Sequence, residues 1–158
     1  MLTVVIYDSK FGNTERIAQA IARGAASHGQ VRLLRADEMV ALPAERPDLL
    51  LVGGPTQRRG MSPGLRAAIG VVAASVQEIP FATFDTRYRG AKLLMGSAAI
   101  EAAKGLARTG GRSAALPESF FVARSGKLET QLLESGEIER AEAWGCAVGR
   151  VALAGAAA

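Results

Sequence analysis

The sequence is poor in cysteine and histidine. Its 158 residues include one of each, Cys146 and His28. A single cysteine excludes a disulfide within the chain, and the two residues together cannot supply the ligands of a structural zinc site. No arrangement of serine, histidine and carboxylate residues indicates a catalytic triad, so we assign no catalytic and no metal-binding residue. The scarcity of cysteine fits a protein of the reducing cytoplasm.

Long apolar runs are also missing. The apolar start at Leu2–Ile6 is short for a signal peptide and leads directly into Asp8 and Lys10. The alanine-rich C-terminus is interrupted by Arg150, and no stretch reaches the roughly 18 apolar residues that a membrane-spanning helix needs. We therefore expect neither a secretory signal nor a membrane span.

The composition is that of a globular domain. Hydrophobic residues make up 49% and charged residues 22% of the chain, which is ordinary for a folded protein. A length of 158 residues suits one domain with a substantial core. We predict a single domain at residues 1–153, followed by an alanine-rich tail at residues 154–158.

The formal net charge of +4 is concentrated in the middle of the chain. Residues 58–112 contain nine basic and three acidic side chains, an excess of +6, whereas the residues before them sum to zero and those after them to −2. Two interpretations are open: a solvated basic face, or a docking patch for an anionic partner. The segment contains no recognisable nucleic-acid-binding module, so we expect no nucleic-acid partner.

Hydrophobic periodicity predicts five strands and four helices. Leu2–Tyr7 is a continuous apolar run rich in β-branched residues, as expected of a strand covered on both faces. Asn13–His28 repeats apolar residues at helical spacing and ends before Gly29. The other predicted strands are Val31–Leu34, Asp48–Val52, Phe81–Phe84 and a segment within Ser113–Val122, and the other predicted helices are Leu65–Val76, Ser97–Arg108 and Glu137–Leu153. Lys92–Met95 either extends the fourth strand or forms a separate one.

The alternation of strands and helices predicts a parallel sheet with right-handed crossovers and a helical layer on each face. Ligands of such sheets bind outside the carboxyl ends of the strands. In this sequence three loops follow strand ends, at residues 8–14, 53–63 and 85–91. We expect a binding site where these loops meet.

The strongest local signal is Ser9-Lys-Phe-Gly-Asn-Thr14, between the first strand and the first helix. Its two hydroxyls, its amide and the free N–H groups of the helix start suit a phosphate dianion, which the helix dipole also stabilises. Gly12 permits close approach of the backbone or a positive φ. The loop lacks both the Walker pattern and the three glycines of the dinucleotide fingerprint, which favours a single terminal phosphate. In the simpler alternative, Asn13 or Thr14 only caps the helix.

Several segments resemble the flavodoxin family. Tyr7–Glu15 is similar to the phosphate loop of flavodoxins, and Gly53–Gly60 to their second loop, beside the flavin. Phe84–Arg87, Gly96–Ala99 and Glu118–Val122 are similar to the flavodoxin-like domains of flavodiiron-type proteins. The resemblance covers nearly the whole chain. It implies an α/β fold, a flavodoxin-like three-layer α/β/α sandwich with a five-stranded parallel sheet in the order 2-1-3-4-5.

The resemblance also implies that the cofactor is FMN. The residues that it assigns to the FMN phosphate are Ser9, Lys10, Phe11, Gly12, Asn13 and Thr14. The residues that it assigns to one edge of the isoalloxazine are Pro55, Thr56, Gln57, Arg58, Arg59 and Gly60, and those for the other edge are Asp85, Thr86, Arg87 and Tyr88.

The chain departs from the family pattern at three points. Phe11 stands where a threonine is usual, so one hydroxyl donor is absent. Gln57, Arg58 and Arg59 occupy the place of an aromatic residue that stacks on the flavin, an interaction worth on the order of 1 kcal/mol. We therefore expect FMN binding that is weakened but not abolished. Tyr88 either supplies the missing ring or is a surface tyrosine. The basic excess contrasts with the acidic surface usual in the family.

The leading hypothesis is an FMN-binding flavodoxin-like electron-transfer protein, a monomer or dimer, whose redox partner protein is acidic at its docking face. The second hypothesis is an FMN-dependent NAD(P)H/quinone oxidoreductase of the same fold, in which Arg58, Arg59 or Arg87 receives an anionic substrate. The third is a flavodoxin-like binding module that has lost flavin.

Overall fold

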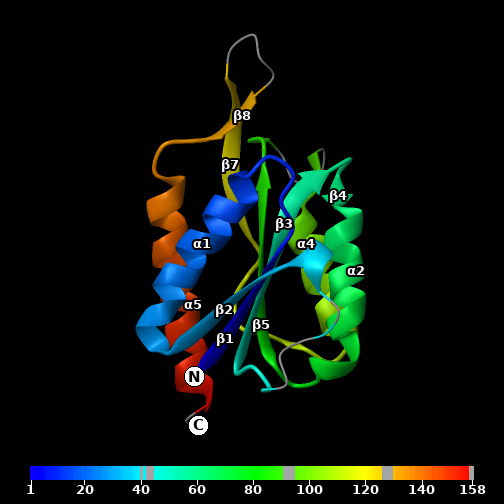
Figure 1. The fold of residues 1–158 in the computed structure, drawn as a ribbon, viewed down its shortest axis with the longest axis vertical. Coiled ribbons are helices and arrows are strands. Elements are labelled where there is room, and N and C mark those ends of the chain that lie inside the picture. The colour runs from blue at the N-terminus through cyan, green and yellow to red at the C-terminus, as the bar shows by residue number, and fades with distance from the viewer. Residues whose placement is uncertain (40, 42–44, 91–94, 126–129, 157–158) are drawn as a thin grey trace.

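Five parallel strands form the centre of the sheet in the computed structural model, which describes residues 1–39, 41, 45–90, 95–125 and 130–156 (Figure 1). They are β1 (Leu2–Tyr7), β2 (Gln30–Arg35), β3 (Leu49–Gln57), β5 (Pro80–Arg87) and β7 (Glu118–Ser125). They are ordered β2-β1-β3-β5-β7 across the sheet, and each neighbouring pair is parallel. The predicted order 2-1-3-4-5 is confirmed.

Three short strands make the sheet larger than predicted. They are β4 (Gly60–Met61), antiparallel to β3, β6 (Arg112–Ser113), parallel to β5, and β8 (Thr130–Leu133), antiparallel to β7. The β7–β8 hairpin projects beyond the carboxyl end of the parallel strands, at the top of Figure 1. The sheet is therefore mixed, with a parallel centre.

Three strand boundaries differ from the prediction. The fifth strand, β7, begins within Ser113–Val122 as predicted, at Glu118, but continues past Val122 to Ser125, and Pro117 separates it from β6, which ends at Ser113. A proline has no N–H to donate to a ladder. The third and fourth strands extend outward to Gln57 and Arg87, so residues 85–87 are strand residues and not a turn. Of the segment Lys92–Met95, only its last residue lies within the described residues.

Pro55 is tolerated inside β3 because β1, the neighbouring strand on one side, has already ended. The β1 ladder stops where Tyr7 pairs with Gly53, two residues before Pro55. On the other side β5 continues alongside, with Thr86 opposite Pro55. The extension carries the second predicted loop outward, so that its turn is reduced to residues 58–59.

Four helices of the described residues cover the two faces of the sheet. The helices α1 (Asn13–Ala25) and α5 (Glu137–Ala156) cover one face, and α2 (Pro63–Val72) and α4 (Ala98–Arg108) cover the other (Figure 1). Short 3-10 turns follow α1, β2 and α2, at Ala26–His28, Ala36–Glu38 and Ala73–Ser75. Each helical layer encloses one apolar core against the sheet, and all six residues of β1 are buried between the two cores. None of the helices in the described residues has the length and hydropathy of a membrane span.

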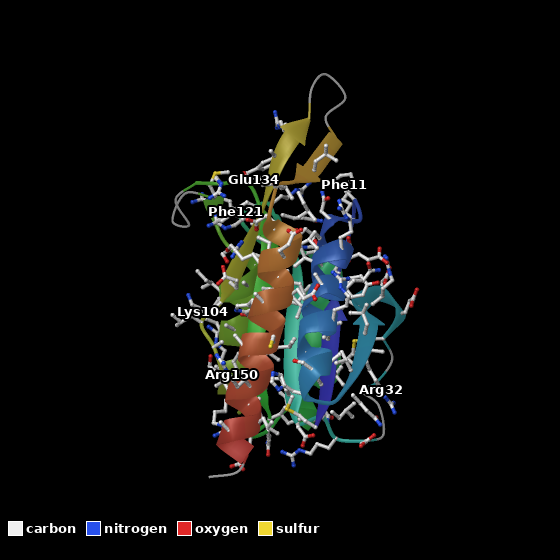
Figure 2. All side chains as sticks on the ribbon, turned by 90° about the vertical axis from the view of Figure 1, so that its left-hand side faces the viewer. Phe11, Arg32, Lys104, Phe121, Glu134 and Arg150 are labelled. Atoms are coloured by element: carbon white, nitrogen blue, oxygen red, sulfur yellow. The ribbon has the colours of Figure 1, made fainter. Side chains whose placement is uncertain are left out.

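Two glycines set the distance between α1 and α5, which lie side by side in both views (Figures 1 and 2). A Cβ atom on Gly24 would overlap the backbone oxygen of Glu142. A Cβ atom on Gly145 would likewise overlap the backbone oxygen of Ile21. Each helix thus presents a glycine to the backbone of the other, and any larger residue must push the helices apart.

Replacement of Gly145 by alanine should therefore destabilise the fold. We expect Gly145→Ala to lower the free energy of unfolding by about 1–3 kcal/mol, because the added methyl group overpacks the interface. Gly70→Ala is the matched control, since Gly70 is an exposed residue of α2 with open space around its Cβ position. Gly70→Ala should raise the free energy of unfolding by about 0.4–1 kcal/mol, because alanine lowers the conformational entropy of the unfolded chain. Urea unfolding of both variants measures the difference, and equal effects would contradict the packing argument.

Candidate functional site

A cavity of about 280 Å³ lies at the carboxyl ends of β1, β3 and β5. All three predicted loops contribute to it. Its lining residues are Lys10, Phe11, Asn13, Thr14, Pro55, Thr56, Gln57, Arg58, Thr86, Arg87, Tyr88 and Val122. The structure thus brings together eleven of the sixteen residues that the sequence assigned to a cofactor, and adds Val122 from β7.

The first loop opens the N-terminus of α1 toward this cavity. Gly12 occupies the N-cap position with a φ of +80°, and no side chain caps the helix. Asn13 and Thr14 are the first helical residues, so the alternative in which either only caps the helix is wrong. The hydroxyl of Ser9 accepts a hydrogen bond from the N–H of Glu15 at 3.3 Å, which fixes the loop.

Thr14 ties the first loop to the third. Its Oγ1 lies 2.7 Å from the Oγ1 of Thr86, and both residues are buried. The start of α1 and the end of β5 are therefore held together at the floor of the cavity.

The second loop is a β-hairpin with a two-residue turn. Thr56 pairs with Met61, and Gln57 with Gly60, so that Arg58 and Arg59 form the turn. Their φ angles are +45° and +72°. A turn with two positive φ angles matches the twist of a hairpin but favours asparagine and glycine. Two arginines in this conformation cost on the order of 1–2 kcal/mol each.

The start of α4 supports this hairpin. Glu101 accepts a hydrogen bond from the N–H of Met61 at 2.6 Å and pairs with Arg66 of α2, also at 2.6 Å. Gly96, with a φ of +72°, lies so close to the carbonyl of Arg59 that a Cβ atom would overlap it. Burial opposes ionisation of Glu101, but the Met61 N–H and the Arg66 guanidinium outweigh it and lower the pKa of this carboxyl group.

Asp85 lies beneath the hairpin and does not line the cavity. Its carboxylate is fully buried. Its Oδ2 atom accepts hydrogen bonds from the hydroxyl of Ser97 at 2.6 Å and the N–H of Ala99 at 3.1 Å. The hydroxyl of Thr56 also donates to Oδ2, at 3.1 Å, and accepts from the N–H of Ala98 at 2.9 Å. The carboxylate thus joins β5, the hairpin and the start of α4.

The guanidinium of Arg87 is buried and engaged within the fold. Its Nε atom donates to the hydroxyl of Ser119 at 3.1 Å and lies 3.9 Å from Oδ1 of Asp85. Its Nη1 atom donates to the carbonyl oxygens of Tyr88 and Gly90, at 3.2 and 3.1 Å. Among the three arginines named in the oxidoreductase hypothesis, Arg87 is thus already used to hold the third loop.

Two aromatic side chains stand at the mouth of the cavity. The ring of Phe11 is 64% exposed, with the Nζ atom of Lys10 5.3 Å from its centre. Tyr88 is half-buried and lines the cavity wall, and the guanidinium of Arg124 lies 5.8 Å from its ring centre. Tyr88 thus lies at the cavity, and its stacking on a flavin stays a prediction.

The remaining predicted residues lie beside the cavity. Ser9 and Gly12 shape the first loop, and Asp85 lies below the hairpin. Arg59 and Gly60 each line a neighbouring hollow, Arg59 together with Met95 and Gly60 together with Arg66. Sequence reasoning missed Val122 and Glu101, because their positions depend on strand register and helix packing. Among the described residues, no group of three His, Cys, Asp or Glu side chains is placed to hold a metal ion.

The ionisation of Glu101 should be visible at the hairpin. A carboxyl group whose pKa is lowered on folding contributes stability above its unfolded pKa, and this contribution disappears as the pH falls through the folded pKa. We expect the amide chemical shift of Met61 to titrate with a midpoint below 4.5, the ordinary pKa of glutamate, and Glu101→Gln to abolish the titration. A midpoint at or above 4.5 would show that the hydrogen bond and ion pair do not stabilise the charged form.

Comparisons with known proteins agree with the fold described above. The family model described as Flavodoxin matches residues 5–144. No curated protein matches the sequence. Among solved structures, the chain is similar to a flavodoxin from the domain Archaea, with 18% sequence identity and a TM-score of 0.76 over 97% of this chain and 99% of that one. It is also similar to Flavodoxin 1 from Bacillus cereus, with 16% identity and a TM-score of 0.77 over 95% and 98% of the two chains.

A third likeness is to part of a longer protein. The flavodiiron protein from Giardia intestinalis shares 22% identity and a TM-score of 0.73 over 97% of this chain but only 36% of its own. At these identities the structures establish the fold, which is the flavodoxin-like sandwich that the sequence predicted. The family model covers most of the sequence, including the first and second loops and the third. The chain therefore belongs to the flavodoxin family.

Proposed function

We propose that the chain binds FMN in the cavity at the carboxyl ends of β1, β3 and β5 and works as an electron-transfer protein. The observation that carries the proposal is the convergence of all three loops on one cavity, with the uncapped N-terminus of α1 open toward it. A bound FMN would supply the redox chemistry, and the protein its anchoring and its surroundings.

The first loop fits a phosphate group. Gly12 at the N-cap position offers no side chain to α1, so that of its first N–H groups the one of Glu15 is bound by a side chain, the hydroxyl of Ser9. Beyond its chain neighbours, no atom lies within 4 Å of the Gly12 Cβ position. These N–H groups and the helix dipole stabilise a dianion. The hydroxyl of Thr14 adds a buried donor, and the exposed Lys10 adds positive charge. Phe11 points an exposed ring to solvent, consistent with the expected loss of one hydroxyl donor.

The other two loops fit the edges of a planar ring system. Pro55 and Val122 offer apolar surface, and Tyr88 offers a half-buried ring. Such groups exclude water from an aromatic ligand, while Gln57 and Thr56 offer polar atoms along its edge. The buried Arg87 keeps the third loop in place without requiring contact with the ligand.

Removal of the Thr14 hydroxyl should weaken FMN binding selectively. A charge-assisted hydrogen bond to phosphate contributes about 1.5–3 kcal/mol. We expect Thr14→Ala to raise the dissociation constant of FMN about tenfold or more, measured by quenching of flavin fluorescence. Thr14→Ser keeps the hydroxyl and should stay close to the parent protein.

Riboflavin is the control ligand, because it lacks the phosphate. Loss of the Thr14–Thr86 hydrogen bond affects both ligands, whereas loss of a phosphate contact affects FMN alone. Equal weakening of FMN and riboflavin would therefore argue against a phosphate site at this loop. Failure of the purified protein to bind either flavin would favour the third hypothesis, a binding module without flavin.

A second candidate function is an FMN-dependent NAD(P)H or quinone oxidoreductase. The observation that favours it is a second hollow, of about 540 Å³, on the outer side of the hairpin, lined in part by Lys10, Arg58 and Arg66. Lys10 and Arg58 suit an anionic substrate there, whereas the charge of Arg66 is paired with Glu101. Steady-state oxidation of NADPH by the FMN-loaded protein, with and without a quinone, separates an enzyme from a carrier. Sustained turnover that Arg58→Gln abolishes would favour the enzyme.

A further inference from the structure

Positive charge gathers at the mouth of the cavity from separate elements. Lys10 comes from the first loop, Arg58 and Arg59 from the hairpin turn, and Arg124 from the outer part of β7. No carboxylate of the described residues forms an ion pair with Lys10, Arg58 or Arg124. Their charges are therefore available to a molecule that approaches the mouth.

Two acidic side chains of this end are paired within the fold. Glu101 pairs with Arg66 at 2.6 Å, and Glu134 pairs with Arg89 at 2.7 Å. Figure 2 shows Glu134 next to Phe121 at the foot of the β7–β8 hairpin, at the same end of the molecule as Phe11. The Arg89 guanidinium lies 4.2 Å from the Phe121 ring centre, which holds this pair against the protein. These two carboxylates are therefore offset locally, and Asp8 of the first loop, which accepts a hydrogen bond from the Ser62 hydroxyl, is the acidic side chain of the described residues that remains near Lys10, Arg58 and Arg124.

Only part of the basic segment 58–112 contributes to this charge. Arg112 pairs with Pro80, where β5 begins, and so lies at the opposite end of the sheet. Lys104 also lies away from the mouth, as Figure 2 shows. The two interpretations of the basic segment therefore apply to different residues: those on α4 and β6 form a solvated face, and those around the hairpin turn surround the cavity.

The hairpin turn carries its arginines at the expense of stability. Asparagine and glycine adopt positive φ readily, whereas arginine does not. Neither the ladder of the hairpin nor its support by Glu101 requires an arginine at either position, because both involve backbone groups. The strain at Arg58 is explained if its guanidinium group acts outside the fold, at the cavity that it lines.

We propose that the mouth of the cavity, with the cations Lys10, Arg58 and Arg124 and the exposed ring of Phe11, is the docking surface for an acidic electron-transfer protein. The inference rests on the proposed function and names its partner class. An exposed aromatic ring beside cations offers an apolar contact together with electrostatic steering. Lys10, Arg58 and Arg124 come from three separate elements at one cavity, which favours a protein over nucleic acid, whose phosphates require a row of contacts.

The test measures binding to two probes of opposite charge, a small acidic [2Fe–2S] ferredoxin and basic cytochrome c. Titration calorimetry uses the full chain with and without FMN, at ionic strengths of about 0.01 M and about 0.15 M. We expect the ferredoxin to bind more tightly than cytochrome c, and about tenfold more weakly at the higher ionic strength. Because ferredoxin binding is also measured without FMN, a failure of the docking proposal can be told apart from a failure of the proposed function. The proposed function fails if the chain takes up no FMN, whatever the ferredoxin result.

Charge reversal locates the surface. At about 0.15 M ionic strength, Arg58→Glu with Arg124→Glu should weaken ferredoxin binding about tenfold or more. Lys104→Glu with Arg108→Glu is the matched control, since it changes the net charge equally on the α4 side. Under the same condition it should stay within about twofold of the parent protein, because the Debye length is then only about 8 Å and Lys104 lies away from the mouth (Figure 2). Equal losses in the two double variants would overturn the proposal, as would tighter binding of cytochrome c or of a short DNA duplex.

A third variant separates docking from folding. Arg58→Asn with Arg59→Gly installs the residues that the turn favours. We expect its Tm to rise by roughly 2–8 °C, since strain is removed, while ferredoxin binding weakens about tenfold. Unchanged ferredoxin binding in this stabilised variant would overturn the proposal even if the charge-reversed proteins fold poorly.

Discussion

The wall of the cavity depends on the buried carboxylate of Asp85. Its Oδ2 atom accepts hydrogen bonds from Thr56, Ser97 and Ala99, which belong to the hairpin and the start of α4. A buried carboxylate is strongly destabilised unless donors surround it, so these elements are held in one arrangement. Its Oδ1 atom is buried without a hydrogen-bond partner, and the Arg87 guanidinium at 3.9 Å supplies the compensating charge. This pair connects the second loop to the third.

From this pair the constraints extend outward to the rest of the site. Arg87 binds Ser119 of β7 and the carbonyl oxygens of the third loop, so the loop that carries Tyr88 is fixed from below. Thr86, the residue between Asp85 and Arg87, contacts Thr14 at the start of α1. Three consecutive residues of β5 thus position all three loops, because alternate strand residues face opposite sides of the sheet and reach different layers.

The sequence predicted the parts of the fold that local patterns determine. The continuous apolar run of β1, the helical spacing of α1 and the alternation of strands and helices were enough for the parallel centre and its order. The first loop was predictable too, because Gly12 follows a buried strand and precedes a helix. These features arise within short segments, and tertiary contacts did not override them.

Features that arise from long-range contacts were not predicted. Asp85 and Arg87 follow an apolar run and look like turn residues, yet β5 continues through them because β3 and β7 extend alongside. The Arg58–Arg59 turn has none of the asparagine or glycine that signals a tight hairpin. Its support comes from Glu101, about 40 residues later in the chain, whose role depends on how α4 packs on the sheet. No local pattern carries that information.

The arginines of the middle segment separate into two groups with different physical roles. Arg66, Arg87 and Arg89 each have a carboxylate partner, and their charges are largely cancelled within the fold. Arg58 has no such partner among the residues that the structure describes, and it sits in a strained turn. Net charge counted along the sequence cannot distinguish these groups, because it weighs a paired and an unpaired arginine equally. The field that an approaching molecule meets is set by the unpaired group, so the distribution of ion pairs, more than the total of +4, determines which partners the cavity mouth attracts.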